Sequence, residues 1–425
     1  MVSGAISMSE LLLDCEKELF ESFQEVDRIA LLNQERVLRA FAANKLTEEF
    51  FAEHTGYGID DCGREAMDAI FADVFECEAA AVRMQMVSGT HAIACALFGN
   101  LAPGDKLVVL TGKPYDTLNQ VIGASAHSHG SLVHLGVKYE ELDLTNMLDT
   151  ASDGEIRAEL AAVAPARLYH IQKSRGYSTE RPTLSNQAIK RLAALVKEVD
   201  AGAHVFVDNC YGEFVEEHEP VALGADLMAG SLIKNPGGGL ALTGGYVAGK
   251  KTLVENSLIR LTAPGIGGHL GVTFNQNRLV FQGLFLAPSV VSGAVKGAML
   301  AASCLARLGL KVDPSPLARR FDIIQAIEFG NRQRLINFCR ALQSYSPVNA
   351  HVAPEPSGMP GYDDEVIMAG GSFVEGATIE LSADGPLREP YAAYLQGGLS
   401  YLHVKTALLG ALNQCAAAAP SSFLP

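Results

Sequence analysis

One lysine stands out by its neighbours, in the stretch 231–239, which reads Ser-Leu-Ile-Lys-Asn-Pro-Gly-Gly-Gly. Lys234 follows a short apolar run and precedes a proline and three glycines. Lysine is normally exposed, because burial of its ammonium group is costly. An amine with a lowered pKa can instead attack a carbonyl and form a Schiff base. The stretch therefore indicates either a nucleophilic lysine or an ordinary exposed lysine beside a glycine turn.

Two further groups of residues could bind parts of a phosphorylated cofactor. Ser88, Gly89 and Thr90 stand between a short apolar segment and a predicted helix, and the free N–H groups at a helix N-terminus bind phosphate. Asp208 ends a very apolar segment, at the sheet edge where α/β proteins bind ligands. An aspartate there can keep a ring nitrogen protonated, and Tyr211 is close enough in sequence to reach a ring hydroxyl. Taken singly, these residues are also explained by helix capping and by a turn after a strand.

The three groups together indicate a more specific chemistry than any one of them. They occur in the order phosphate turn, aspartate, lysine, and Asp208 precedes Lys234 by 26 positions, which leaves room for a helix and another strand. An anion site, a partner for a pyridinium nitrogen and a Schiff-base lysine are what pyridoxal 5'-phosphate requires. The sequence therefore predicts a pyridoxal-phosphate protein with Lys234 at its centre.

The elements that must position these residues alternate between strand and helix. Apolar segments such as 204–207 and 227–233 alternate with helical patterns such as 186–199. This alternation predicts an α/β fold with a mostly parallel sheet that helices cover on both faces. We divide the chain into an N-terminal helical arm (1–52), a large α/β cofactor-binding domain (53–300) and a smaller α+β C-terminal domain (301–425).

Individual elements are also predicted from periodicity and breakers. We expect a strand at 130–135, a long helix at 289–308 that begins after Pro288, a helix at about 322–342 and a last helix at 391–412. These patterns follow from apolar spacing and from Gly and Pro positions.

Composition and charge exclude several classes of protein. The 425 residues carry a net charge of −15, so a nucleic-acid partner is not expected. The apolar region 289–310 is interrupted by Lys296 and Arg307 and is predicted to be a packed helix, not a membrane span. No basic segment of a secretory signal precedes the first apolar residues, and the eight cysteines lack paired spacing. We expect a cytoplasmic protein with reduced thiols.

A metal site is not predicted. His127, His129 and His134 lie close together, but no second group of ligands accompanies them, so surface histidines are the preferred interpretation.

The sequence resembles the fold-type I pyridoxal-phosphate enzymes, which have an aspartate-aminotransferase-like large domain. More closely, it resembles the methionine γ-lyase-like group, also labelled aluminium-resistance or cystathionine β-lyase-like proteins. The resemblance covers about residues 50–410. It is carried by Gly56-Tyr-Gly58 with Gly63-Arg64, Val82-Arg-Met-Gln-Met-Val-Ser-Gly-Thr-His-Ala-Ile93, Thr111-Gly-Lys-Pro-Tyr-Asp-Thr-Leu118, Ile171-Gln-Lys-Ser-Arg-Gly-Tyr177, Val207-Asp-Asn-Cys-Tyr-Gly-Glu-Phe214, the stretch 231–239, Ile379-Glu-Leu-Ser-Ala-Asp-Gly-Pro386 and Tyr394-Leu-Gln-Gly-Gly398.

The resemblance implies roles at the cofactor ring. Lys234 would form the Schiff base and later move protons. Tyr115 would stack on the pyridine ring and assist proton transfer or departure of the leaving group. Asp208 would pair with the pyridinium nitrogen and so make the ring an electron sink.

The resemblance also implies how the phosphate is held. Ser88, Gly89, Thr90 and Ser231 would bind it from the same chain. Tyr57, and less directly Arg64, would reach it from a neighbouring subunit. The resemblance thus implies a homodimer or homotetramer with shared active sites.

Two positions depart from the pattern of the better-known cystathionine and methionine lyases. Ile233 stands where those enzymes have a threonine before the lysine, and Glu380 stands where they have the arginine that binds the substrate carboxylate. Arg388 and Arg175 are then the candidates for that carboxylate, because an arginine can bind it in a bidentate manner. These departures leave the substrate open.

The resemblance favours elimination of a thiol from a sulfur-containing amino acid, of the methionine γ-lyase or cystathionine β-lyase type. Lys234 would remove the α-proton, and the products would be a thiol, ammonia and a 2-oxo acid. The alternatives are aldol cleavage or transamination at the same cofactor, and a pyridoxal-phosphate-binding protein without turnover in stress or metal tolerance. The sequence does not separate β from γ elimination.

Overall fold

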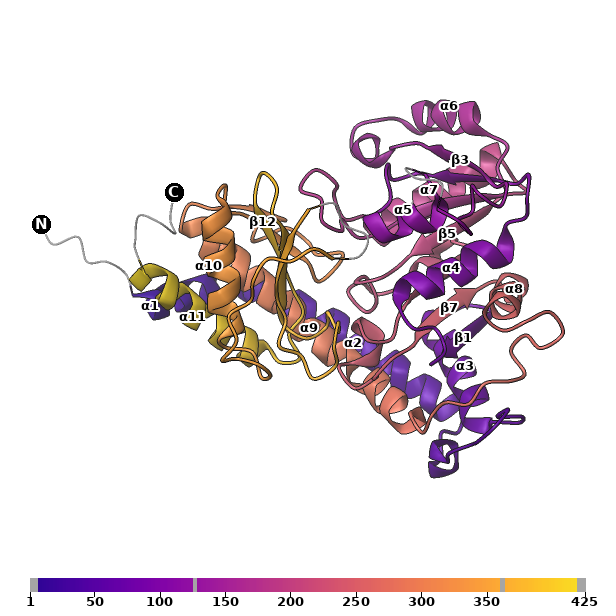
Figure 1. The fold of residues 1–425 in the computed structure, drawn as a ribbon, viewed down its shortest axis with the longest axis horizontal. Coiled ribbons are helices and arrows are strands. Elements are labelled where there is room, and N and C mark those ends of the chain that lie inside the picture. Colours follow the sequence, from indigo (N-terminus) through magenta and orange to yellow (C-terminus); the bar gives the residue numbers. More distant parts are fainter. Residues whose placement is uncertain (1–6, 125–127, 360–363, 419–425) are drawn as a thin grey trace, which may run out of the picture.

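The computed structural model describes residues 7–124, 128–359 and 364–418. Figure 1 shows an α/β body and a smaller part built on a second sheet, and the long helix α9 (Asn277–Arg307) runs from one to the other.

The larger sheet has seven strands in the order β1-β7-β6-β5-β4-β2-β3. From β6 to β3 each neighbouring pair is parallel, whereas β7 runs antiparallel to both β6 and β1. All parallel neighbours therefore end at one edge, where ligands bind in such sheets. The strands are β1 (Ala79–Arg83), β2 (Lys106–Val109), β3 (Lys138–Glu141), β4 (Leu168–Gln172), β5 (His204–Asp208), β6 (Leu227–Ser231) and β7 (Gly245–Gly249).

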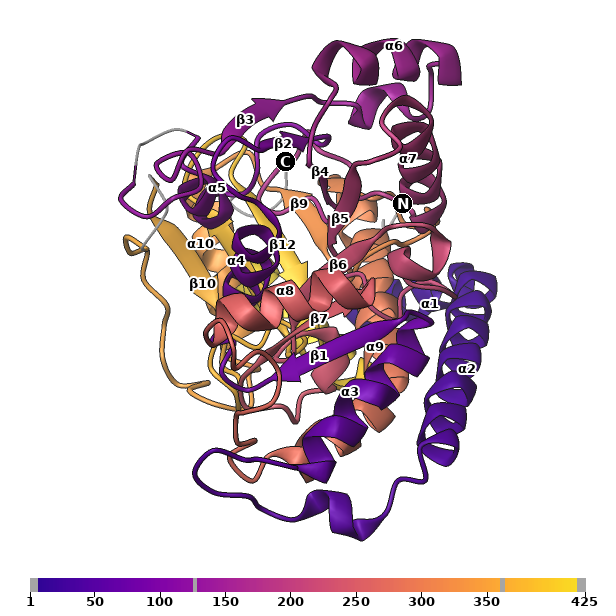
Figure 2. The ribbon, with the colours of Figure 1, turned by 90° about the vertical axis from the view of Figure 1, so that its right-hand side faces the viewer.

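Helices cover both faces of this sheet (Figure 2). One face packs on α4 (Gly89–Asn100), α5 (Asp116–Ile122) and α8 (Lys251–Leu261). The other packs on α3 (Cys62–Phe75), α6 (Asp153–Val163), α7 (Asn186–Val199) and α9. Because both faces are covered, β5 and β6 are almost continuously apolar. The predicted α/β fold with a mostly parallel sheet is confirmed.

The second sheet is antiparallel throughout and has the order β10-β11-β12-β9-β8. Helix α10 (Arg332–Gln343) packs on β10 and β11, and α11 (Tyr401–Ala418) packs on α10. The strands are β8 (Lys311–Asp313), β9 (Gln325–Glu328), β10 (Val366–Ala369), β11 (Ser382–Pro386) and β12 (Ala392–Gln396).

The N-terminal helices α1 (Met8–Glu18) and α2 (Phe20–Ala43) lie along α9. Ser7 and Glu10 form a capping box that starts α1, which satisfies N–H groups that a helix start leaves free. Within the described residues there are also four short 3-10 helices: Glu48–Phe51, Thr145–Met147, Pro220–Leu223 and Asn235–Gly237.

Four predicted segments differ from the structure. Residues 130–135 form turns, since Gly130 and Gly136 have positive φ angles. The region 322–342 holds β9 before α10, and 391–412 holds β12, a turn at Gly397–Gly398 and then α11. Helix α9 begins at Asn277 and contains Pro288; a helix interior tolerates a proline at the cost of one hydrogen bond when tertiary packing holds it.

Helix α9 is long and apolar enough to cross a membrane by length and composition, with a mean hydropathy of 1.6. Of its most apolar window, 72% lies buried inside the protein. It is therefore a core helix of this fold, as its predicted packing role requires. A cytoplasmic location stays a prediction.

Candidate active site

The structure brings eight of the predicted site residues to one cavity of about 250 Å³. The cavity lies at the carboxyl ends of β4, β5 and β6 and at the N-terminus of α4. The predicted residues in its wall are Ser88, Gly89, Thr90, Tyr115, Asp208, Tyr211, Ser231 and Lys234. Tyr57, Arg64, Arg175 and Arg388 lie outside this cavity.

Close packing of glycines fixes the turn that carries Lys234. A Cβ atom at Gly238 would lie 2.2 Å from the carbonyl oxygen of Gly283 on α9, and one at Gly283 would lie 2.1 Å from the carbonyl oxygen of Gly237. No side chain fits at such distances, so the glycines let the turn rest directly on the helix. Asn235, which the sequence reasoning missed, donates to the carbonyls of Tyr211 and Glu213 at 3.0 and 2.9 Å.

The ammonium group of Lys234 lies over the ring of Tyr211, 3.9 Å from its centroid. Burial would lower the pKa of Lys234, but the acidic groups around it, Asp208 among them, outweigh burial and raise that pKa. The expectation of a lowered lysine pKa is therefore wrong for this arrangement of the chain. The physical reason is that the acidic groups around the ammonium, first Cys210, then Tyr211 and Asp208, together favour the charged lysine.

Asp208 is the last residue of β5, and only 4% of it is exposed. Its Oδ1 accepts a hydrogen bond from the backbone N–H of Cys210 at 3.1 Å, and the thiol of Cys210 also donates to it. Burial raises the pKa of Asp208, although Lys234 and the bonds from Cys210 act in the opposite direction. A cationic group beside this carboxylate would be stabilised, as a pyridinium partner requires.

The N-terminus of α4 supplies an anion site. Ser88 is the N-cap, and its hydroxyl accepts from the backbone N–H of His91 at 3.1 Å. The N–H groups of Gly89 and Thr90 make no hydrogen bond within the described part of the chain. A Cβ atom at Gly89 would lie 3.2 Å from both Cys210 Sγ and Ser231 Cβ, so glycine allows this close approach. These free donors, with the helix dipole and Ser231, fit a phosphate group.

Tyr115 precedes α5 and is held by two polar contacts. Its hydroxyl lies 3.1 Å from the hydroxyl of Thr90, and its backbone N–H donates to Gln172 at 3.2 Å. Burial raises the pKa of Tyr115 well above its ordinary value, so the phenol stays protonated and can donate. The sequence reasoning missed several neighbours in this wall: Thr117, Gln172, Ser174, Gly176 and Cys210.

A second cavity of about 330 Å³ adjoins the first, and Tyr115 and Tyr211 line both. It contains the two predicted carboxylate ligands, Arg175 and Arg388, together with two cations that were not predicted, Lys113 and Arg181. Lys113 stands within the motif Thr111–Leu118 and Arg181 follows the motif 171–177. Their closeness in sequence to those motifs is the feature from which a role for Lys113 and Arg181 in the site could have been predicted.

Each predicted arginine is oriented by a carboxylate of the chain. Arg175 contacts the carboxylate of Asp313 and donates to its carbonyl at 3.1 Å, and its side chain is 2% exposed. Arg388 lies 2.9 Å from Asp364 and is 47% exposed. Both guanidinium groups can still offer donors, since arginine has five.

The two departures from the lyase pattern have different structural consequences. Glu380 is buried, and its two carboxylate oxygens accept from the N–H groups of Phe373 and Val374, each at 2.9 Å. Glu380 therefore shapes a turn instead of facing a substrate. Ile233 lines the cofactor cavity, and its Cδ1 atom would lie 3.9 Å from a Cβ at Gly376.

Tyr57 and Arg64 differ in their availability to a neighbouring subunit. Tyr57 is 73% exposed. Arg64 is 2% exposed and donates to the carbonyls of Gly58, Gly271 and His269 at 2.7, 2.9 and 3.2 Å. In this chain Arg64 thus joins two loops, and its role toward a phosphate stays a prediction.

The histidines give no metal centre in the part of the chain that the structure describes. No group of three or more His, Cys, Asp or Glu side chains there could hold a metal ion. The rings of His129 and His134 lie 4.9 Å apart, and His127 falls outside the described residues.

A buried lysine at the end of a mostly parallel sheet, a strand-ending aspartate and a free helix N-terminus fit the three parts of pyridoxal phosphate. Fold and site together define a pyridoxal-phosphate-dependent lyase of fold type I. The chain belongs to the methionine gamma-lyase family, whose model matches residues 8–416.

Several relatives are similar over nearly the whole chain. The uncharacterized protein YnbB of Bacillus subtilis (strain 168) is 49% identical over 405 residues, which are 94% of each chain. A crystal structure of a carbon-sulfur lyase involved in aluminum resistance from Clostridium novyi NT has a TM-score of 0.90 and 45% identity, and the match covers 96% of this chain and 95% of that one. The L-methionine gamma-lyase of Pseudomonas putida is 28% identical over 208 residues, 48% of this chain and 46% of that protein.

Proposed function

We propose that the protein eliminates a thiol from an amino acid in which that thiol carries its own carboxylate, as in cystathionine. The observation that carries this proposal is the cationic cavity beside Lys234. The name of the Clostridium novyi relative, a carbon-sulfur lyase, supports the reaction class.

The second cavity holds more positive charge than one α-carboxylate needs. One bidentate arginine suffices for a carboxylate, yet Lys113, Arg175, Arg181 and Arg388 all line this space. Arg175 and Arg388 each pair with a carboxylate of the chain, whereas Lys113 and Arg181 form no ion pair within the described residues, and Asp116 is the carboxylate in the wall. In a chain with a net charge of −15, such a local excess of cations concentrates anions. The apolar end of methionine would gain nothing from these groups, whereas a second carboxylate would.

The chain's own residues can then orient substrate and move protons. Pyridoxal phosphate, when bound, supplies an electron sink for the negative charge that forms at the substrate α-carbon. The free N–H groups at α4 and Ser231 would hold its phosphate, and Asp208 would hold its ring nitrogen. Lys234 Nζ would take the α-proton, and Tyr115 would donate a proton to the departing sulfur. Arg175 and Arg388 would orient the α-carboxylate, and Arg181 and Lys113 would bind the second carboxylate.

We also propose a homodimer or homotetramer in which each active site is shared. Apolar residues with much of their surface exposed occur in three segments that hydrogen bonds join to one another: Tyr57 (73%), Ile59 (61%), Val87 (73%) and Phe274 (58%). Val87 directly precedes Ser88 of the cofactor cavity. Arg64 ties the loop of Tyr57 to the segment near Phe274. An exposed apolar patch of this kind marks a protein contact.

The test is product analysis with the purified holoenzyme. We expect L-cystathionine to yield thiol, ammonia and 2-oxo acid in equal amounts, with kcat/KM at least about tenfold above that for L-methionine, because two charge-assisted contacts are added. The Lys234→Ala variant should release none. Pyruvate as the oxo acid would assign β elimination, and 2-oxobutanoate would assign γ elimination.

An Arg181→Gln variant separates recognition of the second carboxylate from chemistry. It should lower kcat/KM for cystathionine and leave that for methionine unchanged, while Arg332→Gln, an exposed arginine on α10, should change neither. Transfer of the amino group to an added oxo acid without thiol release would contradict the proposal. Equal turnover of methionine and cystathionine would also contradict it.

A further inference from the structure

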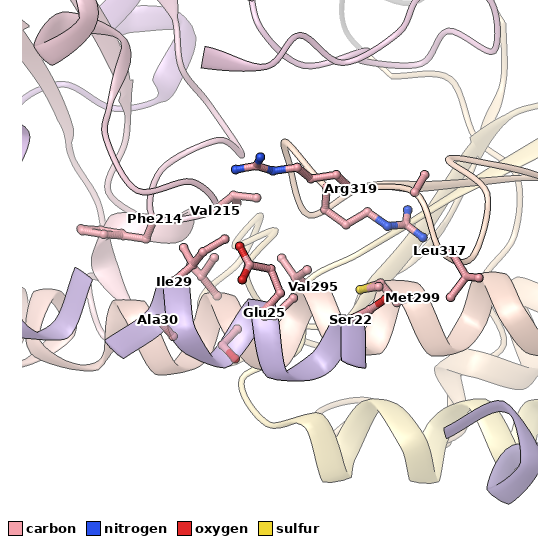
Figure 3. Close-up of a pocket in the computed structure, with 15 residues that line it drawn as sticks. Ser22, Glu25, Ile29, Ala30, Phe214, Val215, Val295, Met299, Leu317 and Arg319 are labelled. Atoms are coloured by element: carbon pink, nitrogen blue, oxygen red, sulfur yellow. The ribbon is translucent and has the colours of Figure 1, made fainter. Parts of the chain in front are cut away.

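A third cavity lies away from the active site, between α2 and α9 (Figure 3). It encloses about 270 Å³. Its remaining walls come from Phe214 and Val215 and from the segment 317–320, which lies between β8 and β9 of the second sheet. Four segments distant in sequence thus meet around one space that the proposed reaction does not use.

The floor of this cavity is apolar and its mouth is charged. Ile29 from α2 and Val295 and Met299 from α9 line the floor, with Glu25 and Arg319 above them (Figure 3). Ile29, Val295 and Met299 are at most 6% exposed. The cavity therefore offers an apolar surface beneath an exposed carboxylate and an exposed guanidinium group.

Glu25 and Arg319 are not paired with each other. Arg319 is exposed and makes no hydrogen bond or ion pair to any residue that the structure describes. Glu25 accepts from Arg28 at 2.7 and 2.8 Å, but a carboxylate has further acceptor positions. The pKa of Glu25 is lowered first by the hydrogen bond from Arg28, and the charge of Arg319 adds to this effect. The carboxylate of Glu25 is thus ionised at neutral pH.

A second arginine also lines this cavity. Arg320, also in its wall, is 5% exposed, and its Nε has no hydrogen-bond partner within the described residues. Its other nitrogens donate to Gln325 at 2.6 Å and to the carbonyl of Ser315 at 3.3 Å. Buried donors without a partner are uncommon and call for an explanation.

We propose that this cavity binds a free α-amino acid with an apolar side chain. Its carboxylate would meet Arg319, its ammonium group would meet Glu25, and its side chain would lie on the apolar floor. A zwitterion matches two separated opposite charges, whereas a fatty acid would leave Glu25 facing its carboxylate, and a dicarboxylic amino acid would place a charge on the floor.

The position of the cavity connects it to the active site. Phe214 follows Tyr211 by three residues, and Asn33 of α2 donates to the carbonyls of Phe214 and Glu216, each at 3.1 Å. On the other side, the segment 317–320 leads to Asp322, which accepts from Ser174 of the cofactor cavity at 2.8 Å. A bound amino acid would contact both connections.

The test measures binding by calorimetry and does not depend on turnover. L-Leucine is titrated into the holoenzyme, with L-aspartate and 4-methylpentanoate as comparison ligands. We expect saturable binding of one leucine per chain and affinities at least about tenfold weaker for the other two. The absorption of the cofactor, followed in parallel, reports any leucine that enters the active site.

Variants locate the binding. Arg319→Gln should weaken leucine binding by about tenfold, and Ala30→Phe, which fills the cavity, should abolish it. Arg278→Gln, an exposed arginine at the start of α9, should bind as the wild type does. Leucine should also raise the thermal midpoint of the wild type and not that of Ala30→Phe.

Three results would overturn the proposal. They are no heat beyond dilution with the wild type, unchanged leucine binding in a folded Ala30→Phe variant, and equal affinity for 4-methylpentanoate, which lacks the ammonium group. Each result is independent of whether the holoenzyme cleaves cystathionine, so this proposal and the proposed function can fail separately.

Discussion

At the scale of single residues, Asp208 is the carboxylate whose charge matters most to the proposed chemistry. Burial raises its pKa, and the N–H and thiol of Cys210 help to keep it ionised. Asp208→Asn keeps the shape but cannot stabilise a positive ring nitrogen. We expect kcat/KM for cystathionine to fall at least about 100-fold, since the electron sink is weakened.

The control for Asp208→Asn is Asp153→Asn, because Asp153 forms an exposed pair with Arg191 far from the cavity. Both variants should bind the cofactor, as their absorption spectra will show, and only Asp208→Asn should lose turnover. Wild-type turnover in a fully loaded Asp208→Asn enzyme would show that Asp208 is not the pyridinium partner.

Asp384 gives a residue-scale prediction about pH. It is buried on β11, and burial raises its pKa to about 7, although bonds from Tyr177 and Gln396 at 3.3 and 2.8 Å act against this rise. The unfolded carboxyl titrates near 4. From about pH 4 to pH 7 the unfolded chain loses a proton that the folded chain keeps, so stability falls as pH rises, by on the order of 2–4 kcal/mol.

Asp384→Asn is neutral at every pH and should lose this dependence. Its thermal midpoint should exceed that of the wild type, and the difference should grow from pH 5 to pH 8. Thermal unfolding at the two pH values measures this. A difference that shrinks as pH rises would show that the folded protein stabilises the ionised carboxylate.

At the scale of elements, the loop between β4 and α7 is held to the segment before β9 by one buried carboxylate. Asp322 accepts from Ser174 at 2.8 Å and from Thr183 at 2.7 Å, and also from the N–H of Ile324 at 3.0 Å. This loop carries Arg175 and Arg181 into the second cavity. The second sheet therefore helps to position the proposed carboxylate ligands.

Asp322→Ala should raise the KM for cystathionine several-fold with a smaller change in kcat. Without Asp322 the loop is disordered in the free enzyme, and the entropy lost when the loop becomes ordered around the substrate weakens binding. The loss of three buried hydrogen bonds should also lower stability by roughly 2–4 kcal/mol. Steady-state kinetics and limited proteolysis of the loop test this, with Asp322→Asn, which keeps one acceptor, as the milder comparison. Unchanged KM in the alanine variant would contradict the positioning role.

The elements also show what the sequence could and could not predict. The parallel sheet, the helix start at Ser88 and the strand end at Asp208 were predictable, because each depends on a local apolar pattern. The second cavity with its four cations was not predictable, because Lys113 and Arg181 come from separate loops. The residues around each of them in the sequence give no sign of a binding site. Strand β12 was missed because its apolar run continues across two glycines into α11.

At the scale of the whole molecule, the second cavity is formed by more than one part of the chain. The second cavity takes Lys113, Arg175 and Arg181 from the larger α/β part and Arg388 from the loop between β11 and β12. Movement of the second sheet against the first would change the distance between these cations. In the proposed reaction, substrate specificity is thus a property of the assembled fold. Asp208 and Lys234 belong to the larger α/β part, where the glycine turn after Lys234 rests on α9.

If each active site is shared between two subunits, as proposed, two inactive variants should regain activity when they are mixed in one oligomer. If Tyr57 reaches the active site of the neighbouring subunit, each site takes Lys234 from one subunit and Tyr57 from the other. Tyr57→Ala and Lys234→Ala then remove residues that different subunits supply to the same site. Each variant alone should be nearly inactive, but random mixed dimers contain one intact site in half of the molecules, which restores about a quarter of the wild-type activity. Mixing Lys234→Ala with Asp208→Asn restores nothing, because both residues belong to the same chain's cavity. No recovery in the first mixture, with formation of mixed oligomers verified, would place Tyr57 outside the neighbour's site and leave its exposed ring to another contact.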